Sequence, residues 1–164
     1  MFRFLVLAGL LGAASCATND NCGQLTLQLG EDVSAYPAST TLSCELHKGS
    51  YWNKAKNEAG LLLTSSDLPA DAHIAAVLSL DMVKPGMTLS VPTGVAGEAF
   101  TNGMKNDANL TSGTVIIQKD VGIDTSITPP ARVFFVKWDL EWLGAGTYQS
   151  HGESTVWFNA IGAL

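Results

Sequence analysis

Residues Arg132 to Trp142, RVFFVKWDLEW, and Thr147 to Phe158, TYQSHGESTVWF, are the two longest strand-like runs of this chain. Every second residue from Phe134 to Trp142 is apolar, which is the pattern of a strand with one buried face. The intervening Gly144-Ala145-Gly146 has glycine at its third position, where three-residue hairpin loops need the left-handed conformation. The two runs are therefore predicted to form an antiparallel hairpin.

This loop pairs Leu143 with Thr147 and so sets the register of the whole hairpin. The expected pairs on the apolar face are Trp142 with Tyr148, Trp138 with Gly152 and Phe134 with Val156, and those on the other face are Lys137 with Glu153, Asp139 with His151 and Glu141 with Gln149. Opposite charges directly across strands contribute about 0.2–1 kcal/mol each. Because a slip of one residue would break both sets of pairs, the two patterns support the same register.

The second face of the hairpin is polar near the loop but mainly apolar at the far end. There it carries Val133, Phe135, Thr155 and Trp157. Large exposed apolar patches tend to mark interaction sites, so these four residues form a candidate patch for a ligand or a partner. Burial under another segment is the alternative, because most aromatic side chains in a domain of this size belong to the core.

Strand patterns also dominate the rest of the chain. Alternation occurs at Leu25 to Leu29 and at Leu42 to Leu46, and a shorter strand is expected at Thr114 to Lys119. Ile74 to Met82 and Met87 to Val91 flank Lys84-Pro85-Gly86, whose proline and glycine favour a turn, and a second hairpin is expected there.

One short helix is expected at Asn53 to Leu62, with Asn53 as its cap. Asn102 to Ser112 and Asp120 to Pro130 have the composition of loops. The predicted fold is all-β and mainly antiparallel, a β-sandwich of about eight strands with at most one short helix; a β-barrel is the alternative.

The N-terminal segment has the anatomy of an export signal. Arg3 precedes an apolar run from Leu5 to Ala14, which is about half the ~20 residues that a membrane-spanning helix needs. Small residues, Ala13-Ala14-Ser15, then lead to Cys16. We expect a signal peptide at 1–15, a short polar tether at 16–21 and one β domain at 22–164.

The end of this segment, Leu11 to Cys16, resembles the lipobox of bacterial lipoproteins. The resemblance implies that Cys16 becomes the lipidated first residue of the mature chain. It also implies the outer membrane of the cell envelope, because Ala17 rather than Asp follows the cysteine. Ordinary secretion, with cleavage after Ala17, is the alternative.

Both routes leave Cys22 and Cys44 as an even pair in an oxidising compartment. Disulfides persist there, so a Cys22–Cys44 disulfide is expected, two reduced thiols being the alternative.

Removing the first fifteen residues takes away Arg3, one of nine positive charges. It leaves eight positive charges against fifteen negative ones, a net charge of −7. Such an acidic chain is a poor nucleic-acid binder, because neutralising phosphates requires clustered cations.

The sequence contains no motif of a nucleotide-binding loop, a serine hydrolase or a zinc protease, and we expect neither an enzyme nor a cofactor. His47, His73 and His151 lie far apart, and Asp120 to Asp124 lacks the density of a calcium loop, so no metal site is expected. The expected function is that of an exported, lipid-anchored envelope protein with a structural or protein-interaction role. The alternative is a secreted or tethered carbohydrate-binding module using Trp157.

Overall fold

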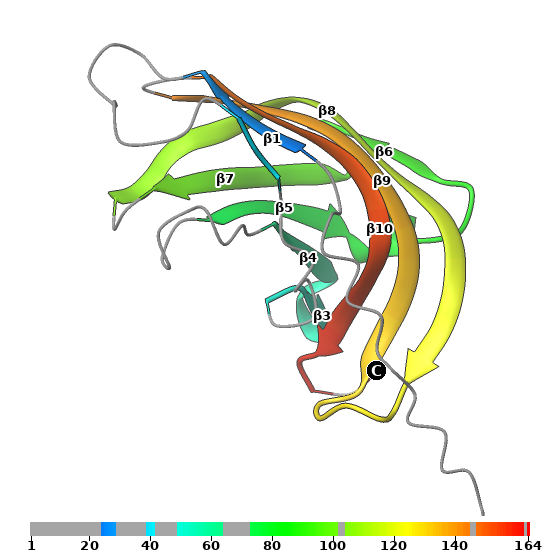
Figure 1. Ribbon diagram of the computed structural model, residues 1–164. Helices are drawn as coiled ribbons and strands as arrows, with labels where there is room; N and C mark the ends of the chain where they lie inside the picture. Colours follow the sequence, from blue (N-terminus) through cyan, green and yellow to red (C-terminus); the bar gives the residue numbers. More distant parts are fainter. Residues whose placement is uncertain are drawn as a thin grey trace, which may run out of the picture.

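Strands make up most of the fold, as the alternation predicts. The computed structural model describes residues 24–28, 39–41, 49–63, 73–101, 104–144, 147–162 and 164. Within these ranges, two single-turn 3₁₀ helices interrupt the strands (Figure 1). The elements are β1 (Gln24–Gln28), β2 (Ser39–Thr41), β3 (Tyr51–Asn53), η1 (Lys54–Lys56), β4 (Glu58–Leu63), β5 (His73–Ser79), η2 (Leu80–Met82), β6 (Thr88–Ser90), β7 (Val95–Thr101), β8 (Met104–Asp124), β9 (Ala131–Gly144) and β10 (Thr147–Ala160).

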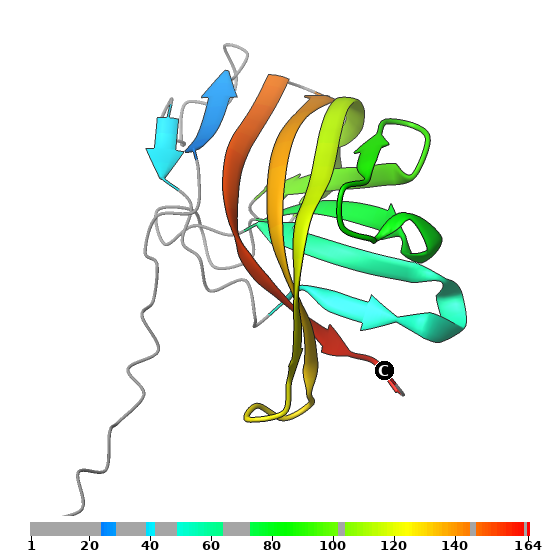
Figure 2. The ribbon, with the colours of Figure 1, turned by 90° about the vertical axis from the view of Figure 1, so that its right-hand side faces the viewer.

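These strands form one sheet that rolls up nearly into a closed barrel (Figure 2). Pairing runs from β10 through β3, β4, β5, β7 and β8 to β9, and β9 pairs again with β10. The β10–β3 contact is parallel and short, joining Asn159 with Tyr51 and Ala160 with Trp52. The predicted all-β class is therefore confirmed, and the barrel alternative describes this single rolled sheet better than a sandwich of two sheets.

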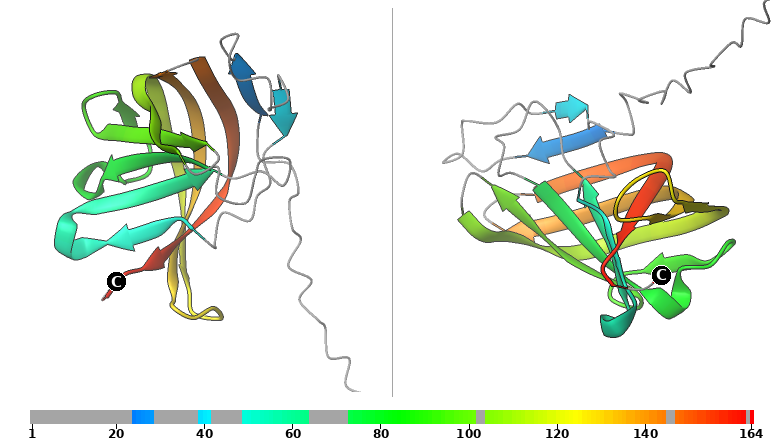
Figure 3. Two further views of the ribbon diagram at one scale, coloured as in Figure 1. Left: turned by 90° about the vertical axis from the view of Figure 1, so that its left-hand side faces the viewer. Right: turned by 90° about the horizontal axis from the view of Figure 1, so that it is seen from below.

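The long strands β8, β9 and β10 form one strongly curved wall, and the shorter β3, β4, β5 and β7 form the opposite side (Figures 1 and 2). The pairing of β8 with β9 shifts three times, between Leu110 and Ser112, Ile117 and Lys119, and Asp120 and Gly122. Such bulges bend a strand and increase its twist, which allows one sheet to wrap around a core. β1 and β2 extend the sheet from the first half of β10 (Figure 3).

The core fills the inside of the rolled sheet. The inward face of β9 carries Phe134, Trp138 and Trp142, each at most 1% exposed, and Phe158 of β10 is fully buried beside them. Leu61, Leu63 and Leu78 belong to the same core cluster from the opposite wall, and Leu89 of β6 joins it from beside β8. Trp52 of β3 stacks on Phe134, with ring centroids 5.9 Å apart.

The predicted register of the C-terminal hairpin is confirmed at every expected pair. Leu143 lies opposite Thr147, and the six pairs named above follow from it. The observed strands are slightly longer than the sequence pattern predicts, at Ala131–Gly144 and Thr147–Ala160. Local turn chemistry and side-chain alternation were thus sufficient to define this pairing.

The predicted helix at Asn53 to Leu62 is wrong. Asn53 does act as a cap, accepting a hydrogen bond from the Lys56 amide at 3.2 Å, but the helix it caps is only the 3₁₀ turn η1. Asn57 then adopts the left-handed conformation, with φ of 57°, and the chain reverses into β4. The segment is therefore a hairpin in which Tyr51 pairs with Gly60.

The predicted hairpin between Ile74 to Met82 and Met87 to Val91 is also wrong, because more distant strands pair with each of these segments. The Lys84 to Met87 turn exists, with the Met87 amide bonded to the Lys84 carbonyl at 3.1 Å. However, β5 pairs with β4 and β7, whereas β6 pairs with β8. The loop expected at Asn102 to Ser112 is strand from Met104 onward, because β8 runs from Met104 to Asp124 and contains the strand expected at Thr114 to Lys119. The loop expected at Asp120 to Pro130 is strand only as far as Asp124 and is confirmed for residues 125–130.

Candidate functional site

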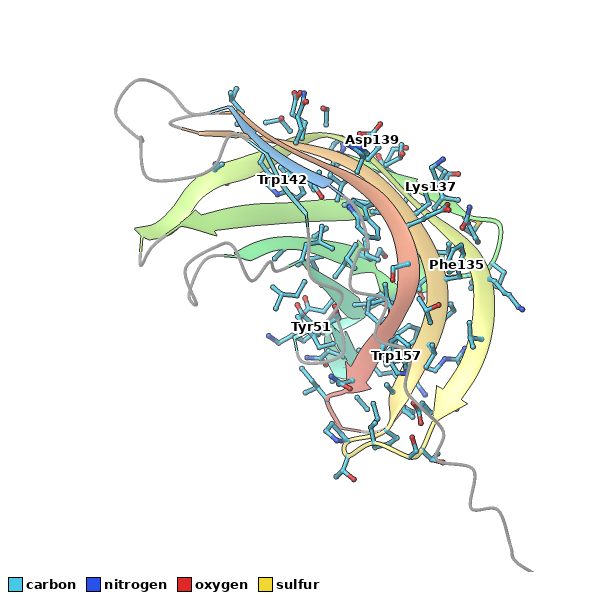
Figure 4. All side chains as sticks on the ribbon, in the orientation of Figure 1. Tyr51, Phe135, Lys137, Asp139, Trp142 and Trp157 are labelled. Atoms are coloured by element: carbon cyan, nitrogen blue, oxygen red, sulfur yellow. The ribbon has the colours of Figure 1, made fainter. Side chains whose placement is uncertain are left out.

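The predicted patch lies on the outer, convex face of the long curved wall, and the structure places its four residues close together. On β9 and β10, Phe135 lies opposite Thr155, and Val133 lies opposite Trp157. The outward side chains of β9 include Phe135, Lys137 and Asp139, while Trp142 points into the core (Figure 4). Val133 is only 4% exposed, whereas Phe135, Thr155 and Trp157 are half-buried.

The Trp157 side chain explains why Val133 is buried. Its indole nitrogen donates to the Asp124 carboxylate, Nε1 to Oδ2, at 3.0 Å. Trp157 lies on β10 and Asp124 on β8, so the indole extends across the intervening strand β9. It therefore covers β9 near Ala131 and Val133, and the expected open patch is in part a packed layer on the outside of the sheet.

Asp124 is held by the turn that follows β8. Its Oδ1 accepts from the Ser126 amide at 2.9 Å and from the Ser126 hydroxyl at 2.6 Å. These two bonds and the bond from Trp157 all favour the ionised carboxylate and lower the pKa of Asp124 below its usual range, the Ser126 hydroxyl having the largest effect. The sequence pattern indicated a loop here and did not predict that it would orient Trp157.

Phe135 has two lysines as neighbours on the outer face. Lys119 of β8 lies directly across from it on one side, and Thr155 of β10 on the other. Lys137 follows two residues later on β9 and therefore points to the same side. Both lysines are exposed. The aromatic half of the outer face thus ends in a basic border.

The remainder of the outer face, toward the β9–β10 loop, is polar and mainly acidic. Glu141 accepts a hydrogen bond from the Gln149 amide at 2.7 Å, across the predicted pair. Asp139 lies opposite His151, and Glu153 lies opposite Lys137. The face therefore has an aromatic and basic half and an acidic half.

A second cluster occupies the inner side of the wall at the end near the β8–β9 turn. The Arg132 guanidinium lies 5.7 Å from the Trp52 ring centroid and 5.4 Å from that of Phe134. Its Nη2 also binds Asp120 Oδ2 at 2.7 Å. This cation covers the aromatic end of the core, and Trp52 therefore belongs to packing rather than to the outer patch.

Tyr51, the neighbour of Trp52 in the sequence, bonds weakly to Glu58, with 3.4 Å between Oη and Oε1. Burial is the main cause of the raised pKa of Tyr51, and the Glu58 carboxylate adds to it because it disfavours a second negative charge. This pair lies on β3 and β4, away from the outer face of β9.

The described residues bring together no candidate metal site. None of the groups of His, Cys, Asp and Glu in this part of the chain could hold a metal ion with three or more ligands. Asp120 and Asp124, the ends of the acidic segment, bind Arg132 and Trp157 respectively. Cys16, Cys22, Cys44 and His47 lie outside the described residues, so lipidation and the disulfide remain predictions.

Within the described ranges, no helix combines the length and the apolar character that crossing a membrane would require. Comparison of the chain with protein-family models, with curated proteins and with solved structures finds no match.

Proposed function

We propose that this protein is exported, is held at the cell envelope by a lipid on Cys16, and acts by contact with other components rather than by catalysis. The N-terminal segment supports this, since Arg3 and an apolar run lead to small residues before Cys16. Ala17 after the cysteine favours the outer membrane. The proposed role is structural or that of a protein-interaction module.

The outer face of β8, β9 and β10 is the proposed contact surface, and its two-part character is the observation that most supports this proposal. Phe135 and Trp157 remain half-buried on the outside of a wall whose inner face already supplies the core. The Asp124 bond holds Trp157 in one orientation. Rigid, partly exposed aromatic residues are the usual anchors of protein interfaces, because their burial yields contact area at a small entropic cost.

Metabolic labelling with palmitate tests the anchor. Label should enter the wild-type chain, and the variant Cys16→Ser should lose both the label and its place in the membrane fraction. Cys22→Ser is the matched control and should keep both. An unlabelled wild-type chain whose mature N-terminus is Thr18 would instead indicate ordinary secretion.

Carbohydrate binding is the second candidate function, and the position of Trp157 favours it. An indole that lies along a sheet and is fixed by a hydrogen bond presents a flat ring, which is suited to stacking on the C–H face of a sugar. Trp157→Ala should abolish binding on a glycan array while thermal unfolding stays cooperative. Equal binding by this variant and the wild type would exclude Trp157 as a sugar platform.

A further inference from the structure

The basic border of the outer face is defined by the strand register. Lys119, Phe135 and Thr155 form a row across β8, β9 and β10, and Lys137 lies two residues beyond Phe135 on the same side of β9. Strand geometry places residues i and i+2 about 7 Å apart. Phe135 therefore has one lysine beside it and another about 7 Å along the strand.

Neither lysine has a carboxylate within ion-pair distance in the described part of the chain. Both are exposed, and the ion pairs found there join Lys56 to Glu58 and Arg132 to Asp120, with neither Lys119 nor Lys137 taking part. Glu153, opposite Lys137, is itself exposed and lies beyond ion-pair distance from it. In a chain with a formal net charge of −6, two such cations beside one aromatic ring form a distinct local site.

The other half of the face limits how a charged partner can bind. Asp139 and Glu141 lie farther toward the β9–β10 loop and would repel an acidic partner placed over them. An acidic partner is therefore directed to the half with Phe135, and a basic partner away from it. Exposed ion pairs contribute little affinity each, so the charges select the partner while the aromatic contact supplies most of the binding.

We propose that this face docks an extended, acidic segment of a partner protein. An apolar side chain of the segment would pack on Phe135 and Thr155, and a carboxylate two residues away would reach Lys137, because alternate side chains of an extended chain have the same spacing of about 7 Å as Phe135 and Lys137. A further carboxylate would reach Lys119. This inference rests on the proposed function and adds the chemistry of the partner.

Selection from a random decapeptide phage library on the full-length chain tests the proposal. The expected result is enrichment of peptides with an apolar residue and Asp or Glu two positions away. The double variant Lys119→Glu/Lys137→Glu should bind these peptides at least tenfold more weakly and should select Lys or Arg at the same position. Lys56→Glu, at an exposed lysine of η1 on the opposite wall, is the control and should change binding less than twofold.

The outcomes separate this inference from the proposed function. If the selected peptides show no preference for acidic residues but bind Phe135→Ser more weakly than the wild type, the acidic partner is contradicted and the contact surface is supported. Peptides that bind Phe135→Ser and the double variant as well as the wild type would contradict both. The proposal would also be overturned if no peptide is enriched. Binding of oligogalacturonate in place of peptides would overturn it in favour of an acidic glycan.

Discussion

The two largest core residues differ in how their polar atoms are satisfied. Trp138 and Trp142 lie on the same face of β9 and are both buried. Trp138 Nε1 donates to the Ser150 hydroxyl at 2.9 Å, whereas Trp142 Nε1 has no acceptor among the described residues. A buried donor without a partner is costly, so the two indoles should contribute differently to stability.

Replacing each tryptophan with phenylalanine measures this difference. Trp138→Phe leaves the buried Ser150 hydroxyl without its partner, while Trp142→Phe removes an N–H that lacks one. We expect Trp138→Phe to lower the free energy of unfolding by about 1–3 kcal/mol more than Trp142→Phe. Urea unfolding of both variants provides the measurement, and equal losses would show that the Trp138–Ser150 bond adds nothing.

Asp124 gives the outer face a dependence on pH. Its pKa in the folded protein lies below 3.8, so the carboxylate stabilises the fold fully above that value. This contribution is lost as the pH falls through the lower, folded-state pKa. Asp124→Asn should therefore flatten the loss of stability below about pH 4, measured by thermal unfolding between pH 2 and 7. An unchanged pH profile would mean that Asp124 is not held as described.

At the scale of elements, the sequence predicts those pairings that a local turn enforces. Gly144-Ala145-Gly146 and the alternation of Phe134 to Trp142 specify one register, and the structure has it. The partner of β6 is β8, more than twenty residues away, and no local pattern encodes that choice. The helix expected at Asn53 to Leu62 does not form, because Asn57 reverses the chain after one 3₁₀ turn.

The candidate site was predictable in part for the same reason. The hairpin register placed Val133, Phe135, Thr155 and Trp157 on one face, and the structure agrees. The neighbours contributed by β8 were not predictable. Lys119 ends an expected strand whose pairing with β9 no local pattern encodes, and Asp124 lies in a segment with the composition of a loop, beyond the bulges of β8. The exposure of Val133 therefore could not be inferred from the hairpin alone.

Substituting two glycines of β8 distinguishes the cost of a close contact between strands from the cost of an unusual backbone conformation. Gly113 and Gly122 have nearly equal φ, 118° and 117°. A Cβ on Gly113 would lie 2.1 Å from the Asp139 carbonyl oxygen, whereas one on Gly122 would have no neighbour within 4 Å. Gly122→Ala should cost about 1–2 kcal/mol for its backbone alone. Gly113→Ala should cost about 1–3 kcal/mol more for the added clash, and equal losses in urea unfolding would contradict the contact.

At the scale of the whole molecule, the rolled sheet depends on a small seam near the C-terminus. The seam joins β10 to β3 through the Asn159 amide and the Ser50 carbonyl at 3.1 Å, and through the Ile161 amide and the Trp52 carbonyl at 2.8 Å. Trp52 and Arg132 cover the core just inside it. Long-range closure of this kind secures the ends of a sheet that would otherwise be edges.

Deleting residues 159–164 should open this seam. We expect faster hydrogen exchange in β3 and a lower unfolding midpoint, because the aromatic end of the core becomes accessible to water. Deleting only residues 162–164 keeps both seam bonds and should leave exchange in β3 near that of the wild type. Equal exchange in β3 for the two deletions would show that the sheet does not need this seam.

The outer face acquires its proposed role only if the chain reaches the envelope and is held there. The intact mass of the mature protein, purified from membranes, tests this most directly. The account predicts a chain that begins at Cys16 and carries the added mass of a lipid. A chain that begins at Thr18 without lipid would remove the anchor, and a chain that still begins at Met1 would contradict export itself.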